Sequence, residues 1–65
     1  MVKHEKIAQL MDEQGITCQA LADEVGVSTA MVSMIRRGLK TPSVEVLVRI
    51  AVRLKVGVQD LVEEK

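Results

Sequence analysis

Positively charged side chains are concentrated in the middle of this 65-residue chain, which is neutral overall. Residues 26–55 carry six Lys or Arg side chains and one Glu, a net charge of +5, while the two flanks together carry −5. Such an asymmetry makes one part of a neutral molecule attractive to phosphate groups. The chemistry that this segment favours is therefore the binding of a polyanion. Within it, we expect Arg49 and Arg53 to solubilise one face of a helix.

The run LADEVGVSTAMVSMIRRG contains small residues at positions where a short chain needs side chains that pack. Gly26 can adopt the positive φ of a tight turn between two helices without a steric penalty. Ala22 is small enough to face the crossing of those helices, and Val32 and Ile35 can anchor the second helix in the core. This pattern predicts a helix-turn-helix over about residues 18–37.

The residue types present give no support to catalysis or metal binding. His4 and Cys18 are the only histidine and cysteine, and the acids are scattered. They form neither a catalytic triad, nor a carboxylate pair, nor a set with metal-ligand spacing. We therefore predict no enzyme activity, no metal, no cofactor and no small-molecule ligand. We expect His4 to be solvated and Cys18 to be an inert small residue rather than a redox sensor.

The composition predicts one small all-α domain spanning residues 1–65. Because Phe, Tyr and Trp are absent, the core must consist of Ile, Leu, Val, Met and Ala, which suit helix packing better than a sheet sandwich. No apolar run approaches the roughly 18 residues of a membrane span. The N-terminus lacks the apolar segment of a secretory signal. A lone cysteine favours a reducing compartment, so we expect a cytoplasmic protein without membrane contact.

Apolar periodicity and capping residues predict five short helices. Thr17 and Ser28 are the expected N-caps of the second and third helices, and Gly57 that of the fifth. In the fourth helix, we expect Val44 to share the buried face with Leu47, Ile50, Ala51 and Leu54. The expected ranges are about 3–14, 18–25, 29–37, 43–54 and 58–64.

A set of spaced positions carries a family resemblance that covers about residues 7–62. These positions are Thr17, Cys18, Gln19, Ala20, Leu21, Ala22, Gly26, Val27, Ser28, Val32, Ser33, Gly38, Pro42, Ser43, Leu47, Ile50, Ala51 and Leu54. In this pattern the chain resembles the phage-repressor/Cro-type (Xre-like) DNA-binding family. The resemblance implies a compact five-helix, lambda-repressor-like domain that binds operator DNA, usually as a two-fold dimer, with the third helix in the major groove.

The resemblance also implies two sets of DNA contacts. Small residues at the start of the third helix would let its N-terminus approach base edges closely. The groove-facing set, called the base-contact residues below, is Ser28, Thr29, Ala30, Ser33 and Met34. Helix N-termini offer free N–H groups to phosphate oxygens. The positions that match phosphate contacts are Thr17, the Cys18 amide, Arg37, Lys40 and Ser43.

The chain departs from the family pattern at two places outside the base-contact residues. Many members have Gln at the position of Cys18, so one side-chain phosphate contact is lost here. Many also pair an Arg on the first helix with a Glu late in the third helix, where this chain has Met11 and Arg36. Both partners are replaced together, so no buried charge is stranded. We expect Arg36 to be free and to add positive charge near the DNA backbone.

The base-contact residues include no Arg, Lys, Asn or Gln, so they cannot make the usual bidentate contacts to G or A. The methyl groups of Thr29, Ala30 and Met34 can pack on thymine methyls, while the Ser33 and Thr29 hydroxyls can make single hydrogen bonds. We therefore predict an operator rich in A·T pairs, with DNA shape and phosphate spacing carrying much of the specificity.

An excess of valine near the end of the fourth helix predicts a homodimer interface formed by Val52, Val58, Leu61 and Val62. Coverage of these valines by helices of the same chain is the alternative. The function we favour is a transcriptional regulator, a repressor that binds a palindromic operator. If Arg36, Arg37 and Lys40 of both copies each neutralise a phosphate, the salt slope of binding is about −5.

Three other interpretations stay open. A helix-turn-helix can be a packing solution with no nucleic-acid partner. A protein-interaction module, antirepressor-like or antitoxin-like, would use the apolar surface of the fourth and fifth helices instead of the third. The chain could also be the DNA-binding head of a longer protein, although Met1 and the acidic ending fit a complete chain.

Overall fold

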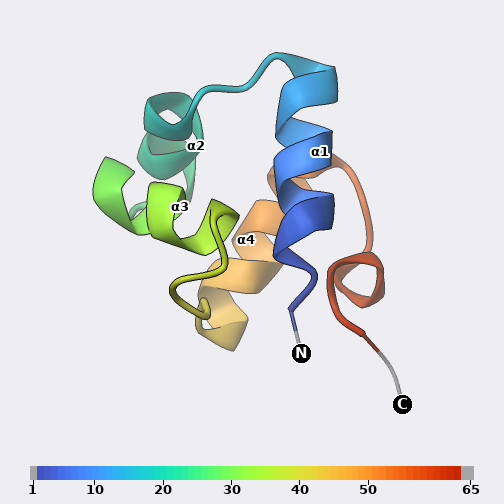
Figure 1. Cartoon of the computed structure of the whole chain (residues 1–65). Coiled ribbons are helices and arrows are strands. Elements are labelled where there is room, and N and C mark those ends of the chain that lie inside the picture. Colours follow the sequence, from blue (N-terminus) through green and yellow to red (C-terminus); the bar gives the residue numbers. More distant parts are fainter. Residues whose placement is uncertain (1, 64–65) are drawn as a thin grey trace.

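The computed structural model describes residues 2–63, which form four α-helices and a final 3-10 turn (Figure 1). The elements are α1 (His4–Gln14), α2 (Cys18–Val25), α3 (Thr29–Arg36), α4 (Val44–Leu54) and η1 (Val58–Leu61). This confirms the predicted all-α fold of five short elements. The fifth element is a 3-10 turn rather than the expected helix over 58–64, whose last residue lies outside the described part of the chain.

Three helices begin at hydroxyl side chains that cap them. The side-chain oxygens of Thr17, Ser28 and Ser43 each accept a hydrogen bond from the backbone N–H three residues further on, at 3.1, 3.0 and 3.3 Å. Each bond satisfies one of the free N–H groups of a helix N-terminus. The predicted caps at Thr17 and Ser28 are thus confirmed, and α4 begins one residue later than expected because Ser43 is its cap.

The turn between α2 and α3 depends on Gly26, which has the left-handed φ of 82°. The N–H groups of Gly26 and Val27 both donate to the Ala22 carbonyl, at 2.9 and 3.1 Å, so the chain leaves α2 at this glycine. Because the turn is short, α3 packs directly on α2, and α2 also packs on α4. The helix-turn-helix expected over residues 18–37 is therefore present.

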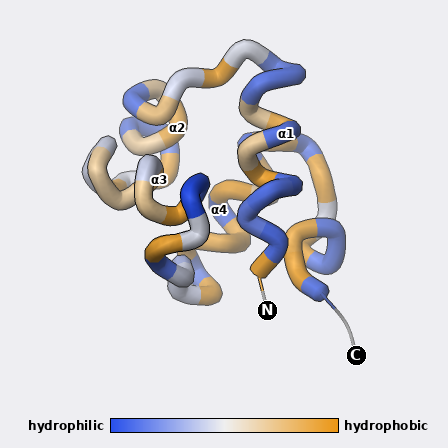
Figure 2. The backbone as a smooth tube through the Cα atoms, in the orientation of Figure 1, coloured by the Kyte–Doolittle hydropathy of each residue, from blue (hydrophilic) through white to orange (hydrophobic). Residues whose placement is uncertain are grey.

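The core is wholly aliphatic and receives side chains from every element and from the α1–α2 connection. Figure 2 shows hydrophobic and hydrophilic residues interspersed along the helices, the pattern of amphipathic helices around one core. The buried residues are Ile7, Leu10, Met11, Ile16, Leu21, Ala22, Val25, Val32, Ile35, Leu47, Ile50, Ala51, Leu54 and Leu61.

Val44 was expected in this core but is 77% exposed. It is the first residue of α4, and burial along that helix begins one turn later, at Leu47. The half-buried Val46 packs against the core in its place.

The two ends of the described chain lie side by side. Val2 and Val62 form an antiparallel β-bridge, and the Lys3 N–H donates to the Leu61 carbonyl at 2.8 Å. This pairing places the start of α1 beside η1 (Figure 1). None of the helices within residues 2–63 has the length and apolar character needed to span a bilayer.

Candidate nucleic-acid interface

The third helix has one buried face and one open face. Val32 and Ile35 are each only 1% exposed, and Met31 packs partly against the same core. On the open side, Ser28, Thr29 and Ala30 are exposed, and Ser33 and Met34 are half-buried. All five base-contact residues therefore reach the surface, with the most accessible ones at the N-terminal tip of α3. Side chains this small leave the tip able to approach another surface closely.

The three capping hydroxyls keep one hydrogen-bonding capacity each. Thr17, Ser28 and Ser43 each use an oxygen lone pair to accept from the backbone. A hydroxyl carries one O–H donor besides its acceptor sites. All three residues are exposed, so each O–H can donate outward to an anionic oxygen. Cys18, beside Thr17, is half-buried, and its amide lies in the first turn of α2.

Half of the positive charge in residues 26–55 is paired within the chain. Arg49 Nη2 lies 2.9 Å from Glu45, and Arg49 Nη1 also donates to the Val25 carbonyl at 3.2 Å. Arg53 forms an ion pair with Glu24 on α2. The two arginines expected only to solubilise α4 therefore also connect it to α2, a role that their helical spacing does not reveal.

Arg36 is the third paired cation, which corrects the expectation that it is free. Its Nη2 lies 2.7 Å from Asp12 Oδ1, and its Nη1 lies 3.9 Å from the Met11 sulfur. The hydrogen bond that Arg36 donates to the Asp12 carboxylate raises the pKa of the Arg36 guanidinium above its ordinary value, against the smaller effect of desolvation. The family position that faces Arg36 holds Met11, and the carboxylate stands one residue further along α1.

Near α3, Arg37 and Lys40 are the cations that form no ion pair within residues 2–63. Both are exposed. Arg37 is the C-cap of α3, and Lys40 follows in the loop to α4. Lys55, exposed at the C-terminal end of α4, is the other cation of the basic segment without a pair in that range.

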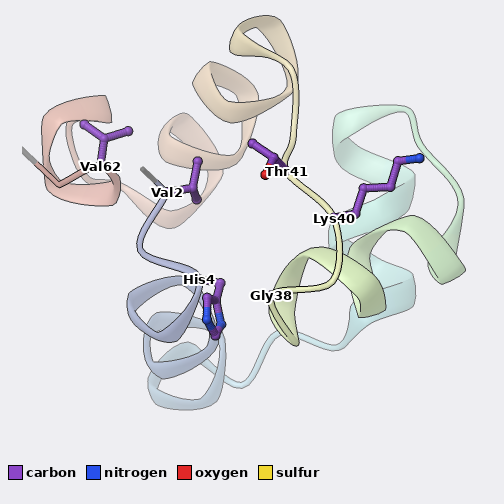
Figure 3. A pocket seen from close by; sticks show the side chains of 6 residues that line it. All are labelled: Val2, His4, Gly38, Lys40, Thr41 and Val62. Atoms are coloured by element: carbon purple, nitrogen blue, oxygen red, sulfur yellow. The ribbon is translucent and has the colours of Figure 1, made fainter.

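His4 is half-buried rather than solvated as expected. Its Nδ1 lies 3.3 Å from the Arg36 carbonyl, so it reaches the C-terminal end of α3 from the start of α1. Figure 3 shows its ring beside Gly38, at a surface hollow between the α3–α4 loop and the paired ends of the chain. The hollow has a volume of about 430 Å³ and is lined by Val2, His4, Gly38, Lys40, Thr41 and Val62.

The residues of the predicted dimer interface differ in their exposure. Val52 is 72% exposed, but Val58 and Val62 are half-buried against the core. Leu61 is 0% exposed, so it cannot contact a second copy, and its assignment to the interface is wrong. The 3-10 turn packs against α1 and α4, and Leu61 belongs to the core that they share.

Comparisons with known proteins agree on one family. Residues 7–61 match the family model described as Helix-turn-helix. The HTH-type transcriptional regulator SinR of Bacillus subtilis is 36% identical over 62 residues, which cover 94% of this chain and 56% of SinR. The SinR of Bacillus licheniformis matches at the same identity and coverage. The chain thus spans little more than half the length of these relatives.

Solved structures show the same architecture. The P22 c2 repressor in complex with a synthetic operator superposes with a TM-score of 0.90 at 25% identity, covering 100% of this chain and 98% of that one. SinR in complex with DNA superposes with a TM-score of 0.83 at 31% identity, covering 92% and 97%. By sequence and by fold, this chain belongs to the Xre/Cro-like helix-turn-helix family.

Proposed function

We propose that this chain is a sequence-specific, double-stranded-DNA-binding transcriptional regulator. In this proposal α3 enters the major groove, and the chain acts as a repressor that occupies a palindromic operator as a homodimer. Its relatives support the assignment, since SinR is named as a transcriptional regulator and solved structures hold SinR and P22 c2 repressor with DNA.

The exposed N-terminal tip of α3 is the observation that carries the proposal. Ser28, Thr29 and Ala30 are exposed, while Val32 and Ile35 on the opposite face are buried. A helix held in this way can insert its first turn into a groove without disturbing the core. If this tip were covered by another element of the chain, the major groove could not receive it.

Phosphate contacts come in this proposal from residues on both sides of α3. Arg37 and Lys40 supply charge, and the O–H groups of Thr17 and Ser43 with the Cys18 amide supply hydrogen-bond donors. Because Arg36 is held by Asp12, it serves mainly to orient α3. The base-contact residues offer methyl groups and single hydroxyls, which favours operators rich in A·T pairs.

The salt dependence of binding tests which cations take part. Each neutralised phosphate lowers the slope of log K against log salt by about 0.9. Arg37 and Lys40 of two copies therefore give a slope of about −4, shallower than the −5 expected with Arg36 included. Gel-shift titrations on duplexes selected from a randomised pool provide both the slope and the operator sequence. G-rich selected half-sites would contradict the A·T prediction.

Charge reversal provides the decisive variant. Arg37→Glu with Lys40→Glu should abolish binding to the selected duplex. Lys3→Glu with Lys55→Glu is the matched control, because it changes the net charge equally at exposed sites away from α3. Equal loss in both double variants would show that only overall charge matters and would remove the proposed interface.

A protein-interaction module is the second candidate, and the exposed valines of α4 favour it. Val44 and Val52 are 77% and 72% exposed, more than a core helix requires. In that case partner binding would survive Arg37→Glu with Lys40→Glu, and the wild-type chain would select no duplex from the randomised pool. The same pair of experiments therefore separates the two functions.

A further inference from the structure

The α4 helix exposes a row of valines beside its buried face. Val44, Val48 and Val52, called the valine stripe below, are 77%, 40% and 72% exposed. Their spacing of four residues places them along one line of the helix surface, as a ridge. Among the described residues they are three of the four large hydrophobic side chains that are exposed.

A hollow lies beside the second half of the valine stripe. It has a volume of about 400 Å³ and is lined by Glu24, Val48, Arg49, Val52 and Arg53. Val44 is absent from its lining and projects from the other end of the same helix. The surface therefore carries an apolar projection at one end and a partly apolar recess at the other.

We propose that the valine stripe is where a second copy of this chain docks, with the two α4 helices antiparallel. Val48 then faces Val48 of the second copy at a two-fold axis, and Val44 enters the hollow beside Val52 of the second copy. The same happens at the other end, because a two-fold contact uses one self-complementary surface twice. This assignment rests on the homodimer of the proposed function and names the surface that forms it.

The charges along the edge of the stripe favour the antiparallel order. Glu45 and Arg53 lie four residues to either side of Arg49 on that edge. In antiparallel order Glu45 lies beside Arg53 of the second copy. In parallel order the charged edges of the two copies would lie on opposite sides of the contact.

Repulsion at the axis is limited by existing bonds. Arg49 sits near its own counterpart there, but its guanidinium is turned to Glu45 and to the Val25 carbonyl of its own chain. Together with Glu24, the charged edge of the stripe carries two acids and two bases in each copy. The two copies therefore meet without net charge.

The size of the stripe predicts a weak contact in free solution. Eight residues of helix rise about 12 Å, so the face is shorter than one that buries the roughly 800 Å² per partner of a stable complex. Two copies held on adjacent half-sites meet at a much higher effective concentration. The contact should therefore be seen most readily by covalent trapping and on DNA with two half-sites.

Cysteine trapping tests the arrangement residue by residue. In a Cys18→Ser background, Val48→Cys should form disulfide-linked dimers on mild oxidation. Helices packed 8–10 Å apart bring residues at the axis within the roughly 7 Å between Cα atoms that a disulfide needs. Val44→Cys alone should remain monomeric, while a mixture of Val44→Cys and Val52→Cys should form mixed dimers. Leu39→Cys, 64% exposed on the α3–α4 loop, is the matched control for random collision.

Two results would overturn the arrangement. One is a yield of Val48→Cys dimer no higher than that of Leu39→Cys. The other is preferential trapping through Val58→Cys or Val62→Cys, which would place the contact at η1. As a second measurement, Val48→Glu should weaken self-association roughly tenfold, because two carboxylates then meet at the axis. Sedimentation at high concentration detects this change without any cysteine, and an unchanged association constant would contradict the proposal.

DNA binding is measured separately from self-association. Val48→Glu should bind a duplex with a single half-site as tightly as the wild type does, and should lose the gain in affinity on a duplex with two. Failure of the wild type to bind any duplex would contradict the proposed function, while the trapping pattern would still decide whether α4 joins two copies.

Discussion

Arg36 near the end of α3 and Asp12 in α1 form an ion pair with 2.7 Å between Nη2 and Oδ1. Two further contacts act at the same place, since Arg36 also meets the Met11 sulfur and its carbonyl oxygen meets His4 Nδ1. The first helix thus holds the C-terminal end of α3, while the opposite end stays open. The direction of the exposed tip depends on contacts made at the far end of the same helix.

Neutralising Asp12 should release this end of α3. Asp12→Asn should lower the free energy of unfolding by about 0.2–1 kcal/mol, the contribution of an exposed ion pair. Arg36→Asp should cost more, since it opposes two carboxylates. The swap of Asp12→Arg with Arg36→Asp should recover most of the loss. Urea unfolding of the four proteins measures each step, and a swap as unstable as Arg36→Asp would contradict the pairing.

Adding an amide to the tip of α3 should change the selected DNA sequence. Ala30→Asn supplies a bidentate partner for adenine, and one such contact provides about 1–3 kcal/mol of base discrimination. Selection from randomised duplexes should then gain a fixed adenine in each half-site. Asp23→Asn, exposed on α2 outside the base-contact residues, is the control and should leave the selected sequence unchanged. A selected sequence that Ala30→Asn leaves unchanged would exclude Ala30 from the groove.

The contact between His4 and Gly38 should be detectable as a stability difference between two glycines. Gly15 and Gly38 both have left-handed φ, at 67° and 78°, so alanine costs about 1–2 kcal/mol at either. A Cβ at Gly38 would meet His4 Nε2 at 2.7 Å, whereas one at Gly15 meets nothing within 4 Å.

Gly38→Ala should therefore destabilise the chain more than Gly15→Ala does. In a His4→Ala background the two costs should become equal, which a double-mutant cycle by thermal unfolding can determine. Equal costs in the wild-type background would show that the imidazole moves away freely.

One lysine with a left-handed backbone conformation offers a way to raise the stability of the chain. Lys55, the C-cap of α4, has φ of 64° and is the one residue other than glycine with positive φ among the described residues. Lys55→Gly should raise stability by about 0.5–1 kcal/mol and the melting temperature by roughly 3–6 °C. Lys55→Ala keeps the Cβ and should give no such gain. A destabilised glycine variant would mean that the lysine side chain itself supports the cap.

The elements that could be predicted from the sequence are those with local signals at both ends. The bounds of α2 follow from the hydroxyl of Thr17 and the left-handed Gly26, and these groups bond within four residues of themselves. The buried residues of α3 follow from spacing alone. By contrast, Val44 continues the apolar period of α4 beyond the point where other elements lie against it, and periodicity carries no information about where the core ends.

Contacts between residues far apart in the sequence have no local signal. The His4 imidazole meets a carbonyl 32 residues away, and the Arg36 side chain finds its carboxylate 24 residues away. A long arginine can reach either of two neighbouring positions on a facing helix, so the exact partner depends on the crossing of α1 and α3. The burial of Leu61 is of the same kind, because it depends on how η1 packs against α1 and α4.

The pairing of Val2 with Val62 makes the domain a closed loop of chain, entered and left at one point. Polypeptide attached before the first of these valines and after the second would depart together, beside the start of α1 and the end of η1. The domain can therefore be carried within a longer protein as an inserted unit. A force applied to both attached segments would act on the bridge between Val2 and Val62 before it acted on any helix that holds the tip of α3.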